Sequence, residues 1–277
     1  MAKNNNPFDD FEGTLGDRNY YRRNGKKVVR LKPGPTPEQV QTSKEFENSR
    51  KAGKEFGGCS SVAKVFTELL SQVSDGNLIS FLHPKLVSIF INFAIADDGD
   101  KGKRKIVVSK NKEFLDELQL HPTLKLRNGT GLYRCRMNNF DTKYFLKLDK
   151  ENLKLDMHIP DYNPTDLMKK SPGATHFRIR LSLFSISDYG LNEKTGKYEP
   201  VSKGSNGLIN CTTTEFIKLE NKDIKDINLS VKLDAPEYSH EDATLFAAIE
   251  IFLDEVIGGK AYMMRSPLGF FLRTLFI

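Results

Sequence analysis

The residues with the clearest chemical potential lie in one short stretch, YYRRNGKKVVR, at residues 20–30. Asn24-Gly25 is the sequence of a two-residue type I′ turn, because both central positions need positive φ, which Asn tolerates and Gly adopts freely. The hairpin that follows from this turn pairs four cations, Arg23 with Lys26 and Arg22 with Lys27. Like charges directly opposite one another destabilise a sheet. Phosphate groups are the chemistry that would compensate them.

The predicted hairpin is basic along its whole length. Between residues 18 and 32 there are seven basic residues, two tyrosines and no acidic residue. Such a ribbon can reach into a nucleic-acid groove, with cations on phosphates and aromatic rings against bases or sugars. In the other interpretation, the Tyr and Val side chains pack on a neighbouring domain and the tip is solvated. Both interpretations remain open. The candidate nucleic-acid-binding residues are Arg18, Tyr20, Tyr21, Arg22, Arg23, Lys26, Lys27, Arg30 and Lys32.

The composition is typical of a soluble globular protein. Of the 277 residues, 38% are hydrophobic and 28% are charged, and this length suggests one large or two modest domains. The net charge of +6 permits polyanion binding without requiring it. The N-terminus has no signal-peptide pattern, and the longest apolar run is too short to span a bilayer. We therefore expect no membrane partner. The three cysteines are widely spaced, so we expect a reducing, cytoplasmic location.

Catalytic signatures are missing from the sequence. The G-x-S-x-G, P-loop and G-x-G-x-x-G motifs do not occur, and the five histidines do not cluster. Cys59 in GGCSS could lie at a helix start, but a helix terminator followed by an N-cap is the favoured interpretation. The run KGKRK at residues 101–105 follows acidic residues, so a solvated loop is favoured over a second phosphate contact. We expect no enzyme, no metal, no cofactor and no small-molecule substrate.

The first half of the chain is predicted to be mainly helical. We expect an extended tail at residues 1–12, the hairpin arm at 13–32 and a helical module at 33–130. Thr36 is placed as an N-cap with Pro37 at the first helical position. That helix should end at Gly57-Gly58. A second helix should follow from residue 60, a third should lie at residues 78–94, and a short one near residues 114–118.

The second half is predicted to be a β-sandwich at residues 131–277. In HFRIRLSLFSI, residues 176–186, four apolar side chains alternate with Arg178, Arg180 and Ser182, which indicates one core face and one wet face. Seven or eight such strands favour an immunoglobulin-like antiparallel sandwich, so the fold class is α+β. The apolar C-terminal end is predicted to be its closing strand, in preference to a docking peptide for a partner. The strands are expected at residues 132–140, 143–149, 153–159, 176–186, 208–219, 227–233, 244–256 and 268–277.

Four segments resemble a family of uncharacterised bacterial proteins: FEGTLGDRNYYRRNGKKVVRLKPG, FENSRKAGKEFG, IPDYNPTDLMKKSPGATHFRI and LFAAIEIFLDEVIGGKAY. That family is typified by a Gly-x-x-Gly basic hairpin, a helical segment ending Glu-Phe-Gly and a Pro-Gly-Ala-Thr-His-Phe-Arg strand start. The resemblance implies a cytoplasmic protein with a basic hairpin, helices and a C-terminal β-sandwich. It implies no activity.

Two functions remain open from the sequence. The first is a non-enzymatic protein that binds nucleic acid or a nucleoprotein such as a ribosome-like particle, with the hairpin arm on phosphates. The second is a structural or adaptor protein of a multi-subunit assembly, such as a phage-like particle or a secretion machine. In that case the hairpin and the tail dock on protein subunits.

Overall fold

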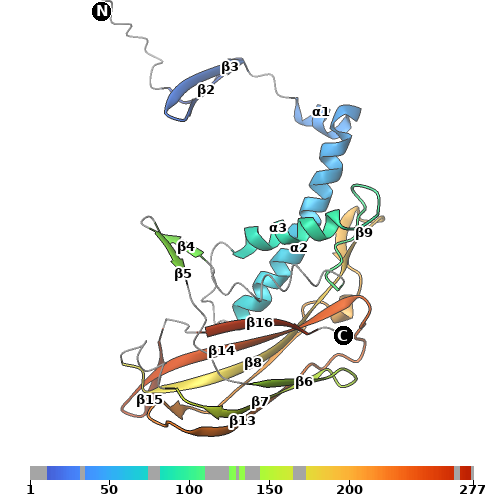
Figure 1. The fold of residues 1–277 in the computed structure, drawn as a ribbon. Coiled ribbons are helices and arrows are strands. Elements are labelled where there is room, and N and C mark those ends of the chain that lie inside the picture. Colours follow the sequence, from blue (N-terminus) through green and yellow to red (C-terminus); the bar gives the residue numbers. More distant parts are fainter. Residues whose placement is uncertain are drawn as a thin grey trace, which may run out of the picture. The chain divides into compact units, whose positions relative to one another are not determined.

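A computed structural model describes residues 11–31, 35–73, 82–109, 144–164 and 173–264, and the backbone of 125–128, 131–134 and 269–275 (Figure 1). Most of the predicted tail, Lys32, the helix expected near residues 114–118 and the module boundary expected at residue 130 lie outside these residues. The chain divides into two compact units, Met1–Arg50 and Lys51–Ile277.

The first unit begins with a small antiparallel sheet and continues into helix. Its strands are β1 (Gly13–Leu15), β2 (Arg18–Arg23) and β3 (Lys26–Leu31), in the order β1-β2-β3. Helix α1 (Pro37–Thr42) starts as predicted, because the Thr36 hydroxyl accepts from the Gln39 amide and the Gln39 side chain accepts from the Thr36 amide. A 3-10 turn, η1 (Lys44–Phe46), then leads into α2 (Glu47–Val73).

The helix boundary predicted at Gly57-Gly58 is wrong. The break lies earlier, at Ser43, where the guanidinium of Arg50 donates to the carbonyls of Val40 and Ser43 at 2.7 and 2.9 Å. Helix α2 then runs without interruption through both glycines. At Gly58 a β-carbon would lie 2.5 Å from Cγ of Tyr198, so the residue is small because a ring packs against the helix.

Two antiparallel sheets form the core of the second unit. The large sheet has the order β11-β8-β14-β15, with β12 beside β8 and β16 beside β14, and the small sheet has the order β13-β7-β6. The alternate side chains of β8 that begin at Phe177 are buried with those of β14 and with the small sheet. The predicted strands are found where their residues are described, except that residues 208–219 form two separate strands, β11 and β12, and not one. The bounds are β6 Phe145–Asp149, β7 Lys154–Tyr162, β8 His176–Ser187, β11 Ile209–Thr213, β12 Ile217–Lys218, β13 Ile224–Lys232, β14 Ala243–Ile257, β15 Lys260–Met263 and β16 Gly269–Leu275.

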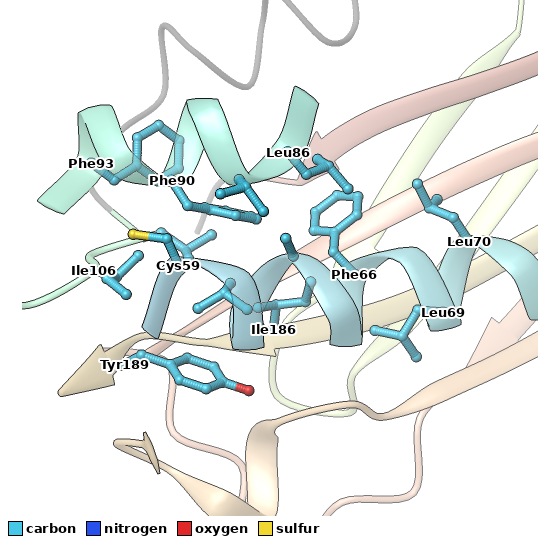
Figure 2. Close-up of a cluster of buried hydrophobic side chains, with 14 of the residues drawn as sticks. Cys59, Phe66, Leu69, Leu70, Leu86, Phe90, Phe93, Ile106, Ile186 and Tyr189 are labelled. Carbon is cyan, nitrogen blue, oxygen red and sulfur yellow. The ribbon is translucent and has the colours of Figure 1, made fainter. Parts of the chain in front are cut away.

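The second face of the large sheet is not the wet face that the alternation predicted. Helices α2 and α3 (Leu82–Ile95) lie over it, on the side opposite the small sheet (Figure 1). Phe66 of α2 contacts Phe184 of β8 and Phe246 of β14 edge-on, with ring centroids 5.7 and 5.1 Å apart. Figure 2 shows the cluster between the two helices and the strands. Helices α2 and α3 thus share a core with the sheet, and burying one such ring stabilises the fold by about 1.5–3 kcal/mol.

Two further hairpins complete the described strands. Strand β9 (Tyr189–Asn192) pairs with β10 (Lys197–Pro200), and β4 (Lys125–Asn128) pairs with β5 (Gly131–Arg134). The helices within the described ranges are all too short or too polar to cross a membrane. The architecture is α+β, with antiparallel sheets throughout.

The two adjacent glycines of α2 make the packing account testable. Gly58→Ala should lower the free energy of unfolding by about 1–3 kcal/mol, because the new methyl group overlaps the Tyr198 ring. A β-carbon at Gly57 has no atom within 4 Å. Gly57→Ala should therefore raise the free energy of unfolding by about 0.5–1 kcal/mol, because alanine favours the helix. Urea unfolding of both variants measures the difference. Equal effects of the two substitutions would contradict the account.

Candidate nucleic-acid interface

The hairpin tip has the predicted register. Asn24 and Gly25 have φ angles of 52° and 74°, the positive values that the turn requires. Across this turn the structure pairs Arg23 with Lys26, Arg22 with Lys27, Tyr21 with Val28 and Tyr20 with Val29. The pairing of like charges is therefore confirmed.

A third strand, missed from the sequence, widens the ribbon. Strand β1 pairs with β2 through a second two-residue turn, with Leu15 opposite Arg18 and Gly13 opposite Tyr20. The signal was present, because Gly16-Asp17 is itself a hairpin dipeptide. Gly16 has a φ of 58°. The candidate interface is consequently a three-stranded sheet and not an isolated hairpin.

The pairing divides the side chains of this sheet between two faces. We name them after their tyrosines, and each carries three cations. The Tyr20 face holds Leu15, Arg18, Tyr20, Arg22, Lys27, Val29 and Leu31. The Tyr21 face holds Asn19, Tyr21, Arg23, Lys26, Val28 and Arg30. The sheet therefore presents positive charge in both directions.

The Tyr20 face is also apolar. The ring of Phe11 lies edge-on to that of Tyr20, with centroids 5.7 Å apart. Gly13 leaves room for this contact, since a β-carbon there would lie 3.4 Å from the Phe11 ring. Val29 and Leu31 are 51% and 60% exposed. Folding of this sheet thus leaves large apolar side chains in water beside the cations.

The described residues of the basic sheet carry more cations than anions. Residues 11–31 carry six basic and two acidic side chains, which is a net charge of +4. Glu12 pairs with Arg22 at 2.9 Å, but both side chains are at least half exposed, so the pair contributes little stability. Arg23 and Lys26, next to the turn, are exposed and form no ion pair with a residue that the structure describes.

The second basic run, Lys101–Lys105, is held by internal contacts. Arg104 donates to both carboxylate oxygens of buried Glu55 at 2.9 and 2.6 Å, and the Gly102 amide donates to the same carboxylate at 2.6 Å. Lys103 pairs with Glu193 at 3.0 Å. The Arg104 guanidinium holds the pKa of Glu55 below its ordinary value, although burial opposes this. Part of this run therefore anchors the loop to α2.

Cys59 is not placed as a nucleophile. It lies within α2, where it is fully buried, and desolvation raises the pKa of its thiol to about 12. Cys211 is exposed, and Cys135 lies outside the described residues. The described histidines are spread over separate elements, and no group of three potential metal-ligating side chains occurs in the part of the chain that the structure describes.

Arg178 and Arg180 are not the ordinary surface residues that the alternation suggested. The guanidinium of Arg178 donates to both oxygens of buried Asp254 at 2.8 and 2.7 Å and lies over the ring of Phe216. Arg180 lies over the ring of Phe252, 4.5 Å from its centroid. These contacts stabilise the polar end of the β8–β14 face. Only the strand pairing, which the sequence did not supply, brings these charges together.

No protein-family model, curated protein or solved structure matches this chain. Its function must therefore be argued from its own residues.

The Glu55–Arg104 pair predicts a pH dependence. Because the pKa of Glu55 is lower in the folded chain than its ordinary 4.5, the stabilisation is complete above that value and is lost as the pH falls through the folded pKa. At neutral pH, Glu55→Gln should cost about 3 kcal/mol, because it leaves Arg104 without its carboxylate. This cost should shrink on acidification.

The matched control is Glu193→Gln, which breaks the exposed pair with Lys103 and should cost less than about 1 kcal/mol. Denaturant unfolding at several pH values tests both variants. A cost for Glu55→Gln that stays constant down to pH 3 would contradict the assignment.

Proposed function

We propose that this chain is a non-enzymatic nucleic-acid-binding or nucleoprotein-associated protein, with RNA or a ribosome-like particle ahead of DNA. The basic sheet contacts phosphates through the cations at its tip. The observation that carries the proposal is the register set by Asn24-Gly25, which pairs Arg23 with Lys26 and Arg22 with Lys27.

Two properties of this sheet support phosphate binding: the repulsion between its paired cations, and the presence of cations on both of its faces. Opposed like charges destabilise the strand pair, and phosphate binding removes that repulsion and releases counterions. Cations on both faces suit a ribbon that enters a groove, where phosphates lie on either side. The rings of Tyr20 and Tyr21 point to opposite faces, where each can contact a base or a sugar.

We also propose that the sandwich is immunoglobulin-like and forms a rigid body of its own. The strand order supports this. Taking the longer strands in chain order, the first, second and fifth form the small sheet, β6-β7-β13, and the others form β11-β8-β14-β16. This division follows the A-B-E and C′-C-F-G sheets of that fold. The two described cysteines are free thiols, which supports the proposal of a cytoplasmic location.

One observation favours a second function, a structural or adaptor role in a multi-subunit assembly. The Tyr20 face exposes Phe11, Leu15, Val29 and Leu31, and exposed apolar residues beside charges are typical of protein interfaces. In that case the basic sheet docks on an acidic protein subunit. Salt separates the two functions, because phosphate contacts weaken steeply with salt and buried apolar anchors do not.

The first function predicts a specific loss on changing the tip. Replacement of Arg22, Arg23, Lys26 and Lys27 by Ala should abolish most binding of a labelled single-stranded RNA in fluorescence anisotropy. It should also reduce the slope of log affinity against log salt by about 3. The unfolding midpoint should not fall, because the substitutions remove repulsion. A control with Lys194, Lys197, Lys222 and Lys225 changed to Ala should retain the slope. Loss of folding in the first variant, or unchanged RNA binding, would refute the proposal.

The second function predicts the opposite sensitivity. Val29→Ser with Leu31→Ser removes apolar anchors from the Tyr20 face and leaves every cation in place. If RNA is the ligand, the affinity measured in the same assay should change by less than about threefold, since no phosphate contact is lost. If the sheet docks on protein subunits, the subunits that co-purify with the unchanged chain should remain bound after nuclease treatment. The same subunits should no longer co-purify with the substituted chain.

A further inference from the structure

A second exposed apolar site lies in the other unit, between α2 and α3. A hollow of about 480 Å³ is lined there by apolar residues of both helices, chiefly Ala52, Phe56, Ile91, Ala94 and Ile95. Phe56 and Ile95 are 55% and 58% exposed, although both belong to helices whose opposite sides are buried. Large apolar side chains gathered around one hollow and rimmed by polar residues mark an interaction site.

A basic rim adjoins this apolar hollow. The charged residues that line a neighbouring hollow of about 460 Å³ are Lys51, Lys54, Lys101, Lys103 and one carboxylate, Asp100, and Lys101 borders both hollows. Lys103 is paired with Glu193. Lys54 and Lys101 are exposed and form no ion pair with a residue in the described ranges. At the base of the apolar hollow, Glu55 and Arg104 neutralise each other. Lys54 and Lys101 outnumber the exposed carboxylate of Asp100, so the charge at the rim is positive on balance.

We propose that this site binds an amphipathic helix of a partner protein that carries acidic residues beside apolar ones. Apolar side chains three and four positions apart would enter the hollow beside Phe56 and Ile95, and carboxylates would reach Lys54 and Lys101. This is the helix-in-groove mode of recognition, in which the hollow supplies affinity and the rim supplies orientation. The proposal does not depend on the basic sheet, because all of its residues lie in Lys51–Ile277.

Other occupants fit less well. A second copy of the chain would bring an equally basic rim against this one, so like charges would meet. A nucleic-acid backbone offers phosphates but no apolar anchor for the hollow. An acidic amphipathic helix satisfies both halves of the site.

The test is a selection of phage-displayed helical peptides on the immobilised full chain, followed by affinity measurements with the synthetic enriched peptides. Two site variants are used: Phe56→Ala with Ile95→Ala, and Lys54→Glu with Lys101→Glu. Two controls match them in exposure and charge: Ile257→Ala, at a residue that is 58% exposed, and Lys194→Glu with Lys222→Glu. Thermal unfolding confirms that each variant is folded.

We expect enriched peptides with acidic residues flanking apolar ones at helical spacing. Their affinity should fall about tenfold or more in each site variant and change less than about twofold in the controls. The proposal is overturned if the enriched peptides bind the site variants with the same affinity as the wild type. It is overturned equally if selection on the wild type enriches no peptide beyond those enriched on the Phe56→Ala, Ile95→Ala variant. It is also overturned if vesicles of phosphatidylserine and phosphatidylcholine bind the chain and the same two variants abolish that binding.

Discussion

The antiparallel pairing of β8 with β14 is the constraint on which the larger unit depends. The two strands pair over twelve residues, from Ser187 opposite Ala243 to His176 opposite Asp254. One face of the pair shares a hydrophobic core with the small sheet. The other face packs against α2 and α3 at one end, through Phe184 and Phe246, and carries the arginine–carboxylate contacts at the other end. Because a slip of one residue would exchange the two faces, burial on both sides fixes the register.

The first unit contrasts with this arrangement. Its sheet has two tight turns and no buried side chain among residues 11–31, and it keeps charged and apolar side chains in water. A small sheet of this kind is marginally stable by itself, and its opposed cations lower that stability further. The features that weaken the sheet are those that a polyanion or an acidic surface would compensate. The proposed function therefore follows from the exposed side chains of this sheet, chiefly Arg23 and Lys26 beside the turn.

Local signals predicted local structure well. The turn at Asn24-Gly25 gave the correct register, and the Thr36 cap gave the correct start of α1. Alternation of apolar and polar residues located most of the described strands of the two large-unit sheets. The predictions from the sequence were wrong where a contact with a distant segment determines the role of a residue. Gly58 is small because the Tyr198 ring lies against it, and Arg178 is half buried because β14 brings Asp254 beside it. Neither contact can be read from a single segment, and the same limit hid the covering of the large sheet by the helices.

The central claim is that nucleic acid compensates the cations of the basic sheet, and one measurement tests it most directly. The tagged chain is captured from cells of its own source, and the sample is divided into untreated, RNase-treated and DNase-treated portions before washing. The account predicts that the co-purifying partners disappear after one of the two nuclease treatments, with RNase the expected one. A defined set of protein partners that survives both treatments, and that is lost when Arg22, Arg23, Lys26 and Lys27 are replaced by Ala, would contradict it and would identify the basic sheet as a protein-docking surface.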